Sequence, residues 1–368
     1  MRILIDLSYC NPERVTGVSN YALRLVTSLL DEYVSVYLLG TERNKEYLKH
    51  FFPNVDIFIF DDVYELNLAN YLFYYNSLKM KLRSIYSLVN ADVFLLPFFT
   101  LWSIIPTGLN NVAVIHDVQP FSFNGKIKNV VYKYFFYKNL KKCCRIVTIS
   151  NYSKSQILKL FPISNEYISV IYNSIITVDP QPIKNLPLPD KYILDVNSME
   201  EYKNHLTLVK AFERICDKIP HSLVIKSRSN DYWKNYIAPY IEKKNLSKRI
   251  ILIDEDLLTE ELAYLFTKAS LFVSTSLMEG FGFTPIEAAI YKTPVITSQC
   301  AALKETTQGE LYYYSPAMDY DALRLKILEV LKNPPSQKKL ETVSMSLKNI
   351  YSPNNQVRQF ITLFKSII

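Results

Sequence analysis

Two glycines flank Phe281 in a chain that contains very little glycine. Only seven of the 368 residues are glycine, which is far below the typical ~7%. Gly280 and Gly282 therefore indicate a backbone that needs positive φ or that approaches a ligand closely. They follow an apolar run of strand length, Leu271–Thr275, and precede Pro285, a residue suited to the first turn of a helix.

A turn between a strand and a helix is a favoured place for an anion. Ligands of parallel sheets lie beyond the carboxyl ends of the strands, and the N-terminus of a helix attracts phosphate. We therefore predict that the turn around Gly282 binds an anion, specifically a nucleotide diphosphate. The alternative is a tight strand–helix turn that holds no ligand.

Two carboxylates flank the same turn. Glu279 lies in the loop beyond the strand, where it can accept hydrogen bonds from sugar hydroxyls on the side away from a diphosphate. Thr284 to Glu287 also fits a capping box, in which the Glu287 carboxylate accepts from the Thr284 amide. The sequence therefore favours neither of two interpretations of Glu287, helix capping and ligand binding.

The elements that must position these residues alternate between strand-like and helix-like runs. The first half predicts strands at Arg2–Leu7, Val34–Leu39, Val55–Phe60, Asp92–Leu96, Val112–His116 and Arg145–Ser150, and helices at Val18–Leu30 and Leu66–Val89. The second half predicts strands at Tyr192–Asn197, Leu223–Lys226, Ile250–Ile253, Leu271–Thr275 and Val295–Ser298, and helices at His205–Ile215, Glu260–Lys268 and Pro285–Tyr291. Such alternation predicts an α/β protein with parallel sheets.

Four prolines within residues 178–190 interrupt this pattern. We therefore predict an N-terminal domain at 1–178, a linker at 179–190 and a C-terminal domain at 191–352. A last helix at 353–368 can pack back on the N-terminal domain. Two α/β domains joined in this way enclose a cleft, where ligands commonly bind.

The net charge of +7 is concentrated in one part of the chain. Residues 66–165 contain twelve Lys and Arg against two Asp. This excess of positive charge suits binding to nucleic acid, phospholipid or a phosphorylated substrate. The alternative is that these lysines and arginines form a solvated surface without a ligand. The segment has no recognised nucleic-acid-binding signature, so we expect no nucleic acid partner.

Aromatic residues interleave with these lysines: Tyr71, Phe73, Tyr74, Tyr75, Tyr132, Tyr134, Phe135, Phe136 and Tyr137. We expect half of them in the core. The others predict peripheral docking on an anionic membrane surface.

The cellular compartment is predicted from the cysteines and the N-terminus. Five scattered cysteines without metal-type spacing indicate a reducing compartment, and Met1–Asp6 enters a strand without a signal-peptide pattern. No apolar run reaches the roughly 18 residues of a membrane span. We therefore expect a cytoplasmic protein, peripheral at the inner face of the plasma membrane.

The motifs resemble the retaining glycosyltransferases of family 4, which have the two-domain GT-B fold. The specific match is Glu279-Gly280-Phe281-Gly282-Phe283-Thr284-Pro285-Ile286-Glu287-Ala288, similar to the Glu-x7-Glu element of the family. Weaker matches follow in family order: Thr16-Gly17-Val18-Ser19, His116-Asp117, Ile149-Ser150-Asn151, Glu200-Glu201-Tyr202-Lys203-Asn204 and Thr293-Pro294-Val295. The resemblance covers nearly the whole chain.

The resemblance implies a role for each matched residue. Glu279 binds hydroxyls of the donor sugar, and Glu287 binds the ribose. Lys203 neutralises the leaving diphosphate, and His116 faces the transferred sugar or the acceptor. The donor-binding set also includes Gly17, Ser198, Arg228, Gly280, Phe281, Gly282, Phe283 and Thr284, with the diphosphate on amides near Gly17 and Gly282.

Three departures from the family pattern affect these expectations. The usual Gly-Arg of the second domain is Asn197-Ser198, so the second phosphate-binding cation is missing or is supplied by Arg228 or Lys226. The usual glycine before Thr293 is Lys292. Asp254-Glu255-Asp256 matches a metal signature of a different fold, but in this order it predicts a loop near the base or a solvated loop.

The resemblance implies transfer of a hexosyl group from a nucleotide-diphosphate sugar to a glycan or polyprenyl-diphosphate-linked acceptor in surface-polysaccharide assembly. Mannose and rhamnose are favoured. A cation and helix N-terminal amides can stabilise the leaving group, so we expect no metal and no cofactor. The alternatives are a nucleotide-sugar epimerase of similar fold and an inactive glycosyltransferase-like scaffold.

Overall fold

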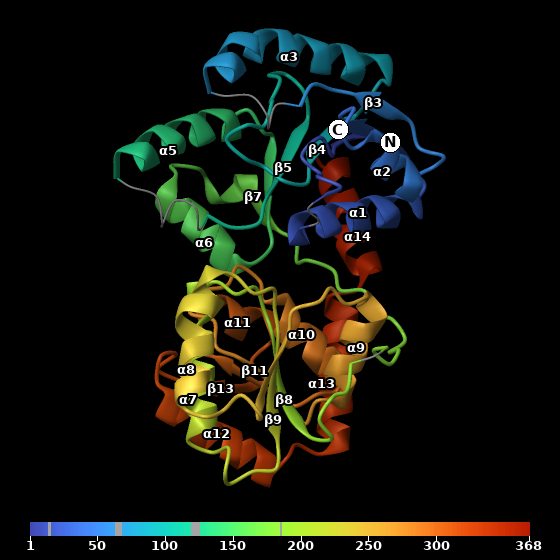
Figure 1. Cartoon of the computed structure of the whole chain (residues 1–368). Coiled ribbons are helices and arrows are strands. Elements are labelled where there is room, and N and C mark those ends of the chain that lie inside the picture. Colours follow the sequence, from blue (N-terminus) through green and yellow to red (C-terminus); the bar gives the residue numbers. More distant parts are fainter. Residues whose placement is uncertain (14–15, 63–67, 119–125, 185) are drawn as a thin grey trace. The chain divides into compact units, whose positions relative to one another are not determined.

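The computed structural model describes residues 1–13, 16–62, 68–118, 126–184 and 186–368. The chain forms two compact units, Met1–Ser174 with Pro353–Ile368, and Ile175–Ser352 (Figure 1). The proline-rich segment that the sequence predicts as a linker belongs to the second unit, where the Gln181 amide donates to the Glu260 carbonyl at 3.0 Å. In the part of the chain that is described, no helix is long and apolar enough to cross a bilayer.

The first unit contains one parallel sheet in the order β3-β2-β1-β4-β5-β6-β7. Its strands are β1 Arg2–Asp6, β2 Ser35–Gly40, β3 Ile57–Ile59, β4 Val93–Leu96, β5 Asn111–Ile115, β6 Arg145–Thr148 and β7 Ile168–Val170. Its helices are α1 Gly17–Leu30, α2 Lys45–Phe51, α3 Leu68–Leu88, α5 Lys126–Leu140, α6 Asn151–Leu160, the short η2 Asn165–Tyr167 and the C-terminal α14 Pro353–Lys365.

The second unit contains a parallel sheet in the order β10-β9-β8-β11-β12-β13. Its strands are β8 Tyr192–Val196, β9 Ser222–Lys226, β10 Ile250–Ile253, β11 Leu271–Ser274, β12 Val295–Ser298 and β13 Tyr312–Tyr314. Its helices are η3 Glu201–Lys203, α7 His205–Glu213, η4 Trp233–Ile237, α8 Ala238–Lys243, α9 Thr259–Lys268, α10 Phe283–Ile290, α11 Ala301–Thr306, α12 Tyr320–Lys332 and α13 Gln337–Ile350.

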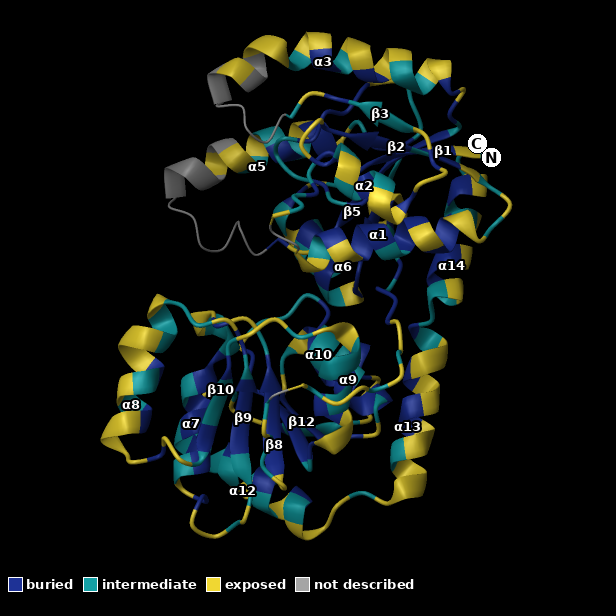
Figure 2. Cartoon of the chain, turned by 45° about the vertical axis from the view of Figure 1, so that its right-hand side comes forward, coloured by how far each residue is buried: buried dark blue, intermediate teal, exposed yellow. Residues whose placement is uncertain are grey.

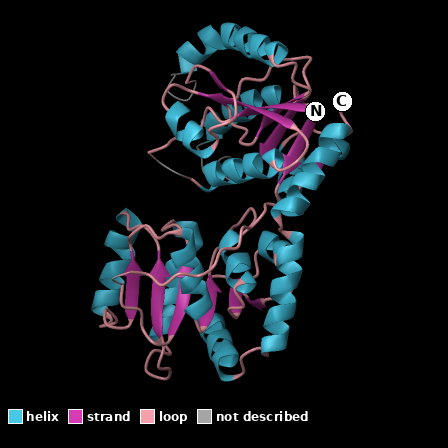
Figure 3. Cartoon of the chain, turned by 90° about the vertical axis from the view of Figure 1, so that its right-hand side faces the viewer, coloured by secondary structure: helices cyan, strands magenta, loops and turns pink. Residues whose placement is uncertain are grey.

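The central strands are buried along their whole length because helices cover both faces of each sheet (Figure 3). All residues of β4, β5, β8 and β11 are buried, and β8 is dark blue in Figure 2. This burial explains why continuous apolar runs, rather than alternating ones, predict these strands. The expected pair of Rossmann-like domains is confirmed.

Each sheet reverses its winding direction once. In the first unit the reversal lies between β1 and β4, which pair in parallel with Ile3 beside Val93. In the second unit it lies between β8 and β11, with Leu271 beside Ile193. Loops leave such neighbouring strands in opposite directions, which opens a crevice at their carboxyl ends. Each unit therefore has a topological switch point at which ligands of such sheets bind.

The C-terminal helix α14 belongs to the first unit and packs against α1. Gln356 connects the two ends of that unit: its Oε1 accepts from Ser174 Oγ and its Nε2 donates to the Tyr172 carbonyl, each at 2.9 Å. Gln356 is buried, so both partners lose their bond when the amide is removed.

Gln356→Ala is expected to lower the free energy of unfolding of this unit by about 1–3 kcal/mol, the cost of unsatisfied buried polar groups. Urea denaturation measures the change. Gln359→Ala on the same helix is the control, because Gln359 Nε2 lies 3.4 Å from both the Asn355 carbonyl and Asn355 Oδ1, at the long limit of a hydrogen bond. Equal stability of the two variants would contradict the docking contact.

Candidate active site

Lys203 and Glu279 meet at the reversal point of the second sheet. Lys203 follows β8 and Glu279 follows β11, the two strands between which the winding reverses. Lys203 Nζ lies 2.6 Å from Glu279 Oε1, and each side chain is 12% exposed. The structure thus joins two residues that the sequence singled out separately.

A left-handed residue holds Lys203 in this position. Asn204, with φ of 60°, links η3 to α7. Its Nδ2 donates to the carbonyls of Thr275 at 3.3 Å and Ala317 at 3.0 Å. Thr275 Oγ1 donates in return to the Lys203 carbonyl at 2.9 Å. These bonds fix the lysine turn to the exit of β11, the strand that leads to Glu279.

Two buried polar side chains, His205 and Asp195, lie close together next to this turn. His205 Nε2 is 3.1 Å from Asp195 Oδ2, and both side chains are almost completely buried. The other oxygen, Asp195 Oδ1, accepts from Asn197 Nδ2 at 2.8 Å. Asn197, which replaces the usual glycine, therefore has a structural contact of its own in this chain. Sequence reasoning assigned no role of their own to Asn204, His205 and Asp195, because their contacts are made with residues outside their own helix or strand.

Of the two glycines in this turn, Gly282 has the left-handed backbone that the sequence predicts, and Gly280 is not among the described glycines with positive φ. Gly282 has φ of 82° and precedes the first residue of α10. A Cβ at Gly282 would lie 2.1 Å from Leu303 Cδ2. The packing beneath the turn, as well as its φ, therefore requires glycine.

The structure corrects two expectations about this turn. Thr284 is the second residue of α10 and Gly282 is its N-cap, so the capping box at Thr284–Glu287 does not form. Phe281 is 2% exposed and packs edge-on against Phe283 and Tyr351, with ring centroids 4.9 and 5.3 Å apart. Its side chain anchors the turn in the core, so only its backbone can contact a donor.

The first turn of α10 is suited to an anion. It contains no acidic residue, and the Phe283 and Thr284 amides belong to the first turn, whose N–H groups have no partner within a helix. The macrodipole adds positive potential at this end. Glu287 lies one turn further along and is half-buried.

Cys300 is a further neighbour that sequence reasoning did not select. Burial raises the pKa of its thiol to about 11, and the Glu279 carboxylate contributes to the rise. The thiol is therefore protonated at neutral pH. All five cysteines are free.

Two other predicted donor residues, Ser198 and Arg228, lie at the same edge of the sheet, beyond the carboxyl ends of β8 and β9. Ser198 is exposed after β8, and its carbonyl accepts from the Glu200 amide at 2.9 Å. Arg228 follows β9 and pairs with Asp256, and its Nε lies 3.1 Å from Asp256 Oδ1. The Arg228 side chain is 61% exposed and carries this surface ion pair. Burial lowers the pKa of Lys226, which ends β9.

The acidic loop after β10 is held by neighbouring side chains. Asp254 Oδ1 accepts from the Ser229 amide at 2.8 Å, and these bonds with Ser229 lower the pKa of the Asp254 carboxyl. Asp256 pairs with Arg228. These contacts hold the loop after β10 against the residues that follow β9.

Gly17 and His116 belong to the first unit. Gly17 opens α1 after the N-cap Thr16, whose Oγ1 accepts from the Ser19 amide at 3.2 Å. A Cβ at Gly17 would meet no atom within 4 Å, so the protein itself gives no steric reason for glycine there.

His116 follows β5 and is a neutral hydrogen-bond acceptor. Its Nε2 lies 2.9 Å from the Pro97 carbonyl, which can only accept, so Nε2 carries the proton. Burial lowers the pKa of His116 to about 4. At neutral pH the imidazole is therefore uncharged and Nδ1 carries a lone pair. It can accept from a sugar hydroxyl but cannot neutralise a phosphate.

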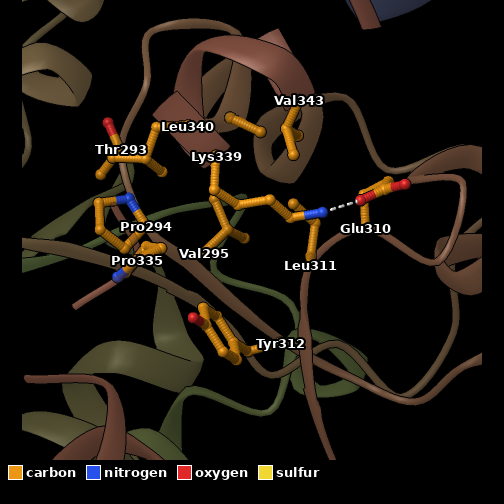
Figure 4. A pocket seen from close by; sticks show the side chains of 11 residues that line it. Thr293, Pro294, Val295, Glu310, Leu311, Tyr312, Pro335, Lys339, Leu340 and Val343 are labelled. Carbon is orange, nitrogen blue, oxygen red and sulfur yellow. Dashed lines mark hydrogen bonds and ion pairs between the residues drawn. The ribbon is translucent and has the colours of Figure 1, made fainter. Parts of the chain in front are cut away.

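One pocket of the second unit lies away from these residues. It has a volume of about 130 Å³. Its lining includes Val295 and Tyr312, the first residues of β12 and β13, and Pro294 and Leu311, which precede them (Figure 4). The Lys339–Glu310 ion pair crosses it. These residues are at the amino ends of the strands, the edge opposite Glu279, so we do not place the donor there.

Comparisons with known proteins agree with this arrangement. The profile described as "Glycosyltransferase Family 4" matches residues 15–178, and "Glycosyl transferases group 1" matches residues 180–344. The structure resembles sucrose-phosphate synthase from Thermosynechococcus elongatus with a TM-score of 0.77 at 15% identity, over 100% of this chain and 98% of that chain. This likeness shows the fold, which is GT-B.

Two relatives are O-antigen chain mannosyltransferases. RfbU of Salmonella typhimurium is 30% identical over 56% of this chain and 58% of its own length. Mannosyltransferase B of Escherichia coli is 23% identical over 69% of this chain and 70% of its own length. The match thus spans less than two thirds of the Salmonella relative. The chain belongs to the glycosyltransferases of family 4.

Proposed function

We propose that this protein transfers a hexosyl group, with retention at the anomeric carbon, from a nucleotide-diphosphate sugar to a glycan or lipid-linked acceptor in surface-polysaccharide assembly. Mannose is favoured over rhamnose because the two relatives are named mannosyltransferases. The observation that carries the proposal is the Lys203–Glu279 pair beside the N-terminus of α10.

Each part of this site has a separate task. The leaving group is a nucleoside diphosphate, so the main task is to stabilise negative charge on its β-phosphate. Lys203 and the first amides of α10 supply positive charge without reorganisation. Glu279 accepts from sugar hydroxyls and holds Lys203 in place before the donor binds. Glu287 is assigned to the ribose.

Donor binding is tested by thermal unfolding with GDP-, UDP- and dTDP-sugars. A donor at 100 times its Kd stabilises the protein by about 2.7 kcal/mol, which is visible as a rise in Tm. We expect a rise with one base, weakened in Glu279→Gln and retained in Glu329→Gln, an acidic residue at the surface of α12.

The outcomes separate the alternatives. A donor-dependent rise followed by transfer to an acceptor supports the proposal. Isomerised sugar without acceptor indicates an epimerase, and binding without turnover indicates an inactive scaffold. No rise with any donor contradicts the donor site.

We also propose that α3 and α5 dock on an anionic membrane. Both helices expose aromatic residues, with Phe73 at 79% and Tyr134 at 60% (Figure 2). Other aromatics of these segments have structural roles: Phe136 is buried, and Tyr75 and Tyr137 pack against the core. The Tyr71 side chain lies outside the described residues.

The double variant Phe73→Ser/Tyr134→Ser is expected to reduce flotation with phosphatidylglycerol vesicles by at least threefold, since each ring contributes apolar burial at the interface. Tyr33→Ser is the control, because Tyr33 is fully exposed on a loop after α1. Flotation that does not depend on anionic lipid would refute the docking surface.

A further inference from the structure

The first unit contains a pocket at the amino ends of β6 and β7, at the edge of its sheet opposite His116. The pocket has a volume of about 280 Å³. Its walls come from the last turn of α5, the start of β6 and the loop between α6 and β7. Most of this wall is apolar and consists of Tyr137, Leu140, Cys143, Ile146, Pro162 and Ile163. Substrates of parallel sheets bind at the carboxyl ends of the strands, so this pocket is separate from the proposed transfer site.

The aromatic part of the wall is fixed by contacts within the protein. The Tyr137 ring stacks on Phe161 with an interplanar angle of 8° and centroids 6.0 Å apart. The Tyr137 hydroxyl donates to the Pro162 carbonyl at 3.0 Å. These contacts connect the last turn of α5 to the loop after α6, so the pocket is formed before a ligand binds, as is usual for ligand pockets.

The interior of the pocket offers few partners to a polar ligand. The Tyr137 hydroxyl is used by Pro162, and the Ser164 hydroxyl donates to Glu166 Oε1 at 3.0 Å. Burial raises the pKa of the Cys143 thiol, which is therefore uncharged at neutral pH. A sugar ring or a nucleotide would leave its own polar groups unpaired against this wall, which costs free energy. The interior therefore suits a hydrocarbon chain.

Positive charge lies at the rim of the same pocket. The lining residues that the structure describes include one cation, Lys141, and no Asp or Glu. Lys141 is exposed, and its Nζ lies over the Tyr137 ring, 5.4 Å from the centroid. Lys138, three residues earlier, is also exposed, whereas Glu166 reaches the lining only through its bond with Ser164. The rim therefore suits an anionic group that stays in contact with water.

One face of α5 leads from exposed apolar residues to this rim. Val130, Tyr134 and Lys138 are spaced by four residues, so they lie on the same face of the helix. The Lys141 amide donates to the Tyr137 carbonyl at 3.0 Å, which continues the helical spacing to Lys141. Val130 is 68% exposed and Tyr134 is 60% exposed. A membrane-docked α5 would thus hold the rim of the pocket at the lipid headgroups.

We propose that this pocket binds one acyl chain of an anionic phospholipid, with the anionic headgroup on Lys141. The chain covers the apolar wall without unpaired polar groups, and the charge remains at the rim. The volume is slightly below the roughly 300–1,000 Å³ of pockets for drug-sized ligands, which suits one chain rather than two. The inference rests on the proposed membrane docking for the source of the lipid and goes beyond the transfer reaction, because this phospholipid is neither donor nor acceptor.

Displacement of the uncharged fluorophore N-phenylnaphthylamine from the full chain measures binding. Lauroyl lysophosphatidylglycerol, below its critical micelle concentration, is expected to displace the probe at an about fivefold lower concentration than lauroyl lysophosphatidylcholine. This factor corresponds to one lysine beside an anionic lipid surface. Each methylene added between the decanoyl and lauroyl chains should lower the Kd about fourfold, the effect of a fully buried methylene.

Two variants test whether the lipid occupies this pocket. Ile163→Trp fills the pocket and should abolish probe binding that the lipid can displace. Lys141→Gln leaves the cavity intact and should remove the preference for the anionic lipid. Lys159→Gln is the matched control, because Lys159 is exposed in the last turn of α6 and does not line the pocket. Thermal unfolding monitors the fold of each variant, and Lys141→Gln decides alone if Ile163→Trp does not fold.

Vesicle flotation and donor titrations separate this inference from the earlier proposals. Lysolipid binding should persist in Phe73→Ser/Tyr134→Ser, and the donor-dependent rise in Tm should persist in Ile163→Trp. Displacement by the anionic lysolipid without flotation of the wild type would support the pocket and contradict the docking surface. Flotation without displacement would overturn the pocket and leave docking and transfer standing. Equal displacement by the two lipids, or an unchanged preference in Lys141→Gln, would also overturn it.

Discussion

Lys203→Ala is expected to reduce the turnover number by roughly 10²–10³-fold, the scale observed for loss of one preorganised charge-stabilising donor. The ammonium group has a fixed position, 2.6 Å from Glu279 Oε1 and mostly shielded from water. Little reorganisation is therefore required when negative charge develops on the leaving diphosphate. Steady-state kinetics with the identified donor measure the loss.

The same substitution removes the counter-charge of a shielded carboxylate, so a structural effect must be separated from a catalytic one. Lys203→Ala/Glu279→Gln removes both charges and should restore the Tm without restoring turnover. Lys210→Ala on α7 is the matched control, because Lys210 contacts the Tyr240 ring at 5.9 Å and not Glu279. Normal turnover and donor affinity in Lys203→Ala would refute the assignment.

Gly282→Ala is expected to weaken donor binding at least tenfold and to lower the Tm. A left-handed alanine costs about 1–2 kcal/mol, and overpacking typically adds about 1–3 kcal/mol. The added Cβ would lie 2.1 Å from Leu303 Cδ2, so either the turn or α11 must move. Donor titrations and thermal unfolding measure the two consequences.

Gly309→Ala separates the two contributions, because Gly309 has φ of 68° in the same unit and a Cβ there meets no atom within 4 Å. Gly309→Ala should lose only the stability that a left-handed alanine costs, and it should retain donor affinity. Gly282→Ala/Leu303→Ala should relieve the overlap and recover part of the affinity. Equal losses in Gly282→Ala and Gly309→Ala would contradict the packing argument.

Much of the fold could be predicted from the sequence because the sheets are parallel and covered on both faces. Strands such as Val93–Leu96 are continuous apolar runs of the expected length. The short strands Ile168–Val170 and Tyr312–Tyr314 were missed. Three residues give too short a pattern, and their pairing with β6 and β12 is decided at a distance.

The candidate site was predicted in its residue types but not in its contacts. Glu279, Gly282 and Lys203 were found because a glycine turn and a family motif are local patterns. The partner of Lys203 is 76 residues away in sequence, and no local pattern encodes that pairing. Phe281 illustrates the opposite error, since its position in the motif suggested a ligand contact whereas packing against Tyr351 places it in the core.

The sequence by itself determined the alternation of strands and helices, the left-handed glycine and the chemistry available at the strand ends. These properties depend on side-chain type, short-range spacing and backbone sterics. Only the tertiary structure decided which charges pair, that Pro97 makes His116 a hydrogen-bond acceptor, and that the end of α5 and the loop before β7 form one pocket. Those features depend on long-range strand order, which places residues from distant segments at the same sheet edge.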